Sequence, residues 1–229
     1  MYSKSKIHEN SFSIAGFINL GSVIISALIS MIFLYLLFYG EFTLDSIYQQ
    51  IQTILVIGAI LNITFLVFYM LGMKNIKSRS DSNNTSEISF ISITASILMF
   101  FILLSTIASS LLIHLIGINW IPIVVGVLSI LYGLTAFFLY YISWRLFRRI
   151  INHVYIKKFN ISFLFLGIFL LISNVLMSVG TFNVLAFVSI SPLSIFLASV
   201  GGLFNIIISV VLIMNNGELK QEISRIKAV

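Results

Sequence analysis

Uncharged amides are the side chains of this sequence best placed to do chemistry, because they interrupt long apolar stretches. They are Asn19, Asn62, Asn174 and Asn205. A primary amide in hydrocarbon needs a hydrogen-bond partner, and interhelical bonds of this kind contribute on the order of 0.6 to 2 kcal/mol. We expect these amides to join helices. The alternative is that Asn62 and Asn205 line a polar path for a small neutral solute.

Catalytic and metal-binding side chains are not grouped in the sequence. No Asp, Glu, Lys or Arg occurs between Ile88 and Trp144 or between Phe159 and Gly217, so these stretches offer no proton-relay carboxylate or buried ion pair. The three histidines, His8, His114 and His153, lie in different regions. The sequence therefore predicts no enzymatic activity, no cofactor and no metal site.

The composition describes a chain that sits in lipid. Of 229 residues, 59% are hydrophobic and 9% are charged, whereas soluble chains carry roughly 25% charged residues. There is no cysteine, which excludes a disulfide scaffold, and the apolar surface excludes a nucleic-acid-binding domain. We expect a multi-pass integral protein of the cell membrane.

Six apolar segments are long enough to cross a hydrocarbon core of about 30 Å as helices. They are apolar on every face, which excludes the alternating pattern of a membrane β-strand. The prediction is an all-α bundle of six spans in one transmembrane domain, residues 1–229. The spans are 12–39, 51–73, 91–115, 121–143, 161–179 and 193–214. The stretch 180–190 either prolongs the fifth span or forms a re-entrant piece.

The basic residues predict the orientation of these spans. With six spans, all 13 Lys and Arg residues fall on one side, and five or seven spans would divide them between two sides. The positive-inside rule then places both termini in the cytoplasm. Tyr140, Tyr141 and Trp144 adjoin Arg145, as an aromatic belt at the inner interface would.

An internal repeat of helical hairpins is suggested by recurring residues. Odd spans begin near Ser11-Phe12, Ser89-Phe90 and Ser162-Phe163. Even spans carry a glycine nineteen positions before a cation, and two of the three also carry Asn62 or Asn205. We interpret the chain as three parallel hairpins, residues 11–77, 89–145 and 162–220.

Two surfaces have predicted partners. The segment from Arg145 to Lys158 has five cations and no anion, so we expect it either to contact anionic lipid head groups or only to mark topology. Small residues at four-residue spacing favour close helix packing, within the chain or between subunits, and the tightest contact is expected at Gly201 and Gly202. The lipid-contact residues are Arg145, Arg148, Arg149, Lys157 and Lys158, and the packing residues are Ser194, Ala198 and Gly202.

The Ile/Ser/Asn/Phe-rich composition, the absence of cysteine and the basic inner ends of the hairpins resemble archaeal multi-spanning membrane proteins of unknown function. This resemblance covers the spans and implies no specific activity. The expected function is a non-catalytic structural or accessory component of a membrane complex, associating with other membrane subunits or with itself. A permease-like transporter is the alternative.

Overall fold

The computed structural model describes residues 10–39, 44–79, 83–111, 121–150, 154–182, 193, 196–197 and 200–214. All of these residues except two turn positions, Asn10 and Asn160, are helical, which confirms the all-helical prediction for this part of the chain. The helices are α2 (Ser11–Tyr39), α3 (Leu44–Arg79), α4 (Asn83–Leu111), α6 (Ile121–Ile150), α7 (Val154–Phe159) and α8 (Ile161–Phe182), followed by the helix Val200–Met214.

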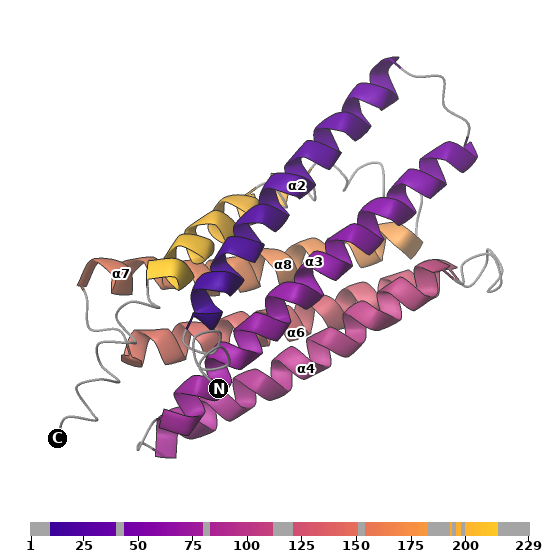
Figure 1. The fold of residues 1–229 in the computed structure, drawn as a ribbon. Helices are drawn as coiled ribbons and strands as arrows, with labels where there is room; N and C mark the ends of the chain where they lie inside the picture. Colours follow the sequence, from indigo (N-terminus) through magenta and orange to yellow (C-terminus); the bar gives the residue numbers. More distant parts are fainter. Residues whose placement is uncertain are drawn as a thin grey trace, which may run out of the picture.

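The long helices lie side by side as a bundle in which chain neighbours pack together (Figure 1). Pairs α2 and α3, α3 and α4, α4 and α6, and α6 and α8 are in contact, with the most extensive packing between α6 and α8. The helix Val200–Met214 contacts α8 through Phe204 and α2 through Asn205. The helices therefore form a closed ring of contacts, in which the last described helix returns to α2.

Four helices contain apolar windows long enough to cross a membrane. The windows are Val56–Lys77, Asn84–Ser109, Gly126–Arg149 and Lys157–Leu176. Ser11–Ile25 and Val200–Met214 are shorter apolar helices. Large apolar side chains such as Phe17, Phe101 and Leu203 are exposed on the outer faces, as a lipid-embedded bundle requires.

The helices are longer than the predicted spans. α3 begins at Leu44 and ends at Arg79, so it takes in polar residues that we expected in the connections, and α6 continues to Ile150. Hydropathy marks where a helix enters hydrocarbon, and Lys, Arg and Gln are good helix formers that extend it into the aqueous phase. α8 ends at Phe182, and residues 183–190 of the ambiguous stretch lie outside the described residues.

The two ends of the bundle differ. At one end, which we call the basic end, α2, α4 and α8 begin and α3 and α6 finish (Figure 1). The opposite end is the far end, where the tips of α2 and α3 project away from α4 and α8 (Figure 1). The described basic side chains belong to the basic end: Lys74, Lys77, Arg145, Arg148, Arg149, Lys157 and Lys158.

Candidate functional site

A polar cluster joins α2 to the helix Val200–Met214. The Asn19 amide nitrogen donates to the Ser209 hydroxyl at 3.0 Å and lies 3.3 Å from both the backbone oxygen and the side-chain oxygen of Asn205. Ser209 in turn donates to the Asn205 backbone oxygen at 2.8 Å. Asn19 is buried, and the cluster links residues almost two hundred positions apart in sequence. Two of the four predicted amides, Asn19 and Asn205, are therefore hydrogen-bonded to each other.

Gly16 allows this contact, because a Cβ at that position would lie 2.6 Å from the Ser209 backbone oxygen and 2.8 Å from the Ile213 side chain. By contrast, a Cβ at Gly202 would meet no described atom within 4 Å, and at Gly201 only Leu166 at 3.7 Å. The closest approach to this helix among described glycines is therefore at Gly16, and the expectation of a tightest contact at Gly201 and Gly202 is not supported. Ser194 and Ala198 lie outside the described residues.

The other two predicted amides bond within their own helices. Asn62 donates to the Gly58 backbone oxygen and Asn174 donates to the Leu170 backbone oxygen, both at 2.8 Å. Within the described residues Asn62 and Asn205 are not brought together. Each sits half-buried.

A second polar cluster, buried between α3, α4 and α6, was not predicted. The Tyr69 hydroxyl of α3 contacts Ser143 of α6 and lies 3.4 Å from Ser92 of α4, and all three residues are buried. Ser143 donates its proton to the Leu139 backbone oxygen at 2.6 Å, so Tyr69 must donate to Ser143. Ser92 is left as the donor to Tyr69. Three helices are thus joined by an ordered chain of donors.

Aromatic rings fill the space beside this cluster. Phe147 of α6 lies 5.5 Å from Phe12 of α2 and 5.3 Å from Phe163 of α8, measured between ring centroids. Phe12 also lies 5.9 Å from Tyr69 and covers Gly72 of α3, where a Cβ would be 2.7 Å from the ring. Phe12 and Phe163, which occupy equivalent positions in the proposed repeat, thus both contact Phe147.

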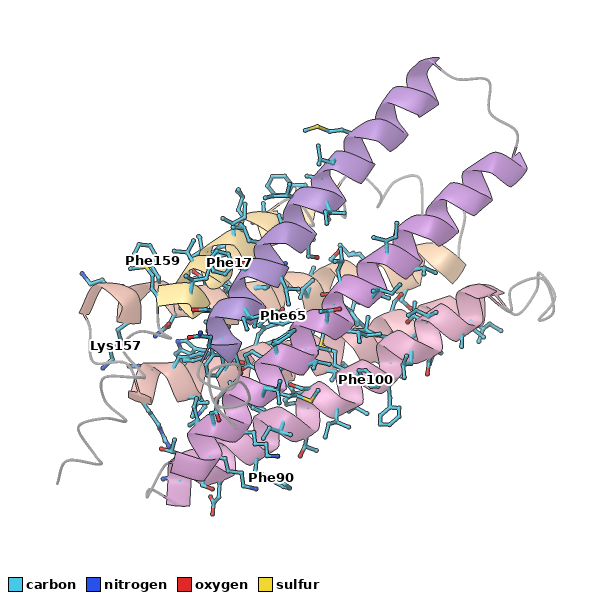
Figure 2. The ribbon with its side chains drawn as sticks, viewed as in Figure 1. Phe17, Phe65, Phe90, Phe100, Lys157 and Phe159 are labelled. Carbon is cyan, nitrogen blue, oxygen red and sulfur yellow. The ribbon has the colours of Figure 1, made fainter. Side chains whose placement is uncertain are left out.

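The middle member of the Ser-Phe series behaves differently. Phe90 is 54% exposed where α3 ends and α4 begins (Figure 2), and the Lys77 ammonium lies 4.4 Å from its ring centroid. Its serine, Ser89, is buried like Ser11 and Ser162. The three Ser-Phe pairs therefore share a buried serine, but only the rings of Phe12 and Phe163 are buried and that of Phe90 is exposed.

The α6 and α8 pair packs through two glycines, Gly133 and Gly167, that the sequence does not single out. A Cβ at Gly133 would lie 2.9 Å from the Asn174 side chain, and a Cβ at Gly167 would lie 3.3 Å from the Phe137 backbone. Each glycine therefore lets the opposite helix approach closely. Single glycines in apolar helices were the available signal, but only the partner helix shows which of them are covered.

The cations of the predicted lipid-contact segment are exposed. Arg145, Arg148, Arg149, Lys157 and Lys158 all lie at the surface, and Arg148 sits 5.5 Å from the Trp144 ring. The chain has no Asp or Glu between Glu87 and Glu218 to neutralise them. The prediction of an aromatic belt is wrong for Tyr140. This residue is buried against Phe163, because its position on α6 faces α8.

No cluster of metal-ligating side chains occurs in the part of the chain that the structure describes, and His8, His114 and His153 lie outside it. Comparison with protein-family models, with curated proteins and with solved structures gave no match. Function must therefore be argued from the residues themselves.

Proposed function

We propose that this protein is a six-span, non-catalytic component of a membrane complex, with both termini in the cytoplasm. The observation that carries the proposal is how the polar groups inside the helices are used. Asn19, Asn205 and Ser209 bond to one another across helices, and so do Tyr69, Ser92 and Ser143. These groups hold the bundle together.

The distribution of charge supports the proposed orientation. The described cations lie at the basic end, and the connections predicted on the opposite side carry only Glu41 and Asp45 among charged residues. The positive-inside rule assigns the basic end to the cytoplasm. Single-cysteine variants of this cysteine-free chain test the assignment. A membrane-impermeant thiol reagent applied from outside should label Glu41→Cys and leave Arg149→Cys unlabelled, whereas labelling of Arg149→Cys in intact cells would contradict it.

Association with other subunits is the functional core of the proposal. Copurification of the tagged full chain from native membranes in a mild detergent should recover a stoichiometric membrane partner. A chain that runs as a single monomeric species, with no partner at any detergent concentration tested, would contradict an accessory role.

The alternative function is a permease-like path for a small neutral solute. It has one observation in its favour: a Cβ at Gly58 would meet no described atom within 4 Å, and Gly58 lies one helical turn from Asn62. Against it, Asn205 is held by Asn19.

Substitution by leucine separates the two functions. Because Asn205 bonds across helices and Asn62 within its own, Asn205→Leu should reduce thermal stability and Asn62→Leu should change it little. If Asn62→Leu instead abolishes solute flux in reconstituted vesicles while the chain stays folded, the path is the better description.

A further inference from the structure

The turn between α7 and α8 carries a polar side chain with unmet hydrogen-bonding capacity. Asn160 is fully buried, and neither its side-chain nitrogen nor its side-chain oxygen has a hydrogen-bond partner. A buried amide without a partner costs about 1 to 3 kcal/mol. Such a group is rare in folded proteins, so it needs an explanation, and a bound ligand is one that would satisfy it.

The position of Asn160 indicates the charge of that partner. Asn160 immediately precedes Ile161, the first residue of the long helix α8, and its backbone oxygen accepts the Phe163 N–H at 3.1 Å. The first N–H groups of a helix lack intrahelical acceptors and carry partial positive charge, so they favour phosphate. Here the side-chain oxygen of Asn160 does not cap them.

The surroundings of the turn add positive charge. Lys157 and Lys158 precede Asn160 on α7 and are exposed (Figure 2). Phe147 stacks on Phe163, which brings the end of α6, with exposed Arg148 and Arg149, to the first turn of α8. No Asp or Glu occurs in this part of the sequence to compete for these cations.

Exposed apolar residues lie beside the lysines. Phe159 is 55% exposed and Ile161 is 45% exposed, on either side of Asn160. Aromatic and aliphatic side chains next to lysines are typical of a segment at the boundary between acyl chains and head groups. These neighbours favour a lipid as the source of an anion at this turn.

We propose that the α7–α8 turn binds the phosphate of an anionic lipid head group, with Lys157, Lys158 and the first turn of α8 as its ligands, and that the Asn160 amide, which is buried in this structure, turns outward to contact the phosphate on binding. The inference rests on the proposed membrane location but not on the accessory role. It differs from general attraction to a charged surface, because it assigns one lipid to one turn.

The test is the dissociation constant of the first phosphatidylglycerol bound to the full chain in neutral detergent, measured by native mass spectrometry. Lys157→Gln/Lys158→Gln should weaken it roughly 30-fold. Lys74→Gln/Lys77→Gln removes the same charge from exposed positions on α3 and should weaken it less than about threefold. Equal losses in the two double variants would reduce the interaction to diffuse electrostatics and overturn the proposal.

Asn160→Leu supplies a second, independent readout. In phosphatidylcholine nanodiscs it should keep or raise the melting temperature, since it removes a buried polar group without a partner. It should also reduce the added stability that phosphatidylglycerol gives the unsubstituted chain. An unchanged lipid effect in Asn160→Leu would overturn the assignment of this turn.

Two further arms separate the possible failures. Inorganic phosphate at the same concentration should not reproduce the stabilisation, and if it does, the ligand is a free anion and the lipid assignment is wrong. Resistance of the chain to carbonate extraction from membranes tests the membrane location by itself. A chain that resists extraction but shows no preference for phosphatidylglycerol would defeat only this inference.

Discussion

The two parts of α2 differ in burial, and they represent two regions of the molecule. Between Ser11 and Asn19 it buries Phe12, Ala15 and Gly16 against three other helices and ends this contact with the Asn19 amide. Beyond Asn19 none of its described side chains is buried, and Ile24, Leu28 and Met31 are exposed. The same helix is part of a protein core at the basic end and presents an exposed apolar surface toward the far end.

The difference teaches how a chain with little polarity obtains a specific fold. Lipid is as apolar as leucine, so burial of apolar side chains does not by itself drive helices together in a membrane. Close packing and hydrogen bonds must do so, and several of these contacts between described residues lie toward the basic end. There Phe147 touches two other rings, Tyr69 joins three helices and Gly16 admits a backbone.

The largest expected effect comes from the centre of the aromatic cluster. Phe147→Ala removes a fully buried ring that contacts Phe12 and Phe163, and the cavity that it leaves should cost about 2 to 3 kcal/mol in the free energy of unfolding in mixed detergent micelles. Phe138→Ala, on the same helix but 56% exposed, is the matched control and should change stability little. Similar losses in both would remove the distinction between core and lipid-facing surface.

Glycines of α2 should respond with opposite signs. Gly16→Ala places a methyl group 2.6 Å from the Ser209 backbone oxygen and should destabilise the fold by roughly 1 to 3 kcal/mol. Gly21→Ala meets no described atom within 4 Å and should stabilise the helix by about 0.5 to 1 kcal/mol. Thermal unfolding of the two variants in one detergent makes the comparison. A gain in stability from Gly16→Ala would show that α2 does not approach its neighbour as described.

A smaller loss than at Phe147 or Gly16 is expected at the buried Tyr69 hydroxyl. Tyr69→Phe keeps the ring but removes the contacts to Ser92 and Ser143, which should cost about 0.6 to 2 kcal/mol. The double variant Ser92→Ala/Tyr69→Phe should lose little more stability than Tyr69→Phe alone, because the Ser92 hydroxyl has no Tyr69 oxygen to bond once the phenol is removed. Additive losses would mean that Ser92 is held by other groups.

Much of the fold follows from composition. An apolar run without charges is expected to be helical in lipid, and α2, α3, α4, α6 and α8 occupy five of the six predicted segments. Four helices of the described part are long and apolar enough to cross a membrane, and α2 is not among them. Helix ends were harder to predict: Lys74 and Arg149 are helical although the predicted spans end at residues 73 and 143. Hydropathy indicates whether a residue favours an apolar or an aqueous environment, but it carries little information on where a helix ends.

The candidate site was predictable only in part. The sequence drew attention to the amides and favoured a role in joining helices, and Asn19 and Asn205 do bond to each other. It paired Asn62 with Asn205 by repeat position, whereas the partner is set by which helix lies alongside. Tyr69, Ser92 and Ser143 gave no signal, since serines and tyrosines recur throughout the chain.

The residues alone therefore predicted the apolar surroundings of this chain, the helical class of its described part and the grouping of the described cations, because each depends on the transfer free energy of side chains taken one at a time. Only the tertiary structure decided that Gly16 is covered while Gly21 is open, that Phe12 is buried while Phe90 is exposed, and that Asn160 is buried without a partner. Those outcomes depend on the surface of a neighbouring helix, and a single segment of sequence contains no record of it.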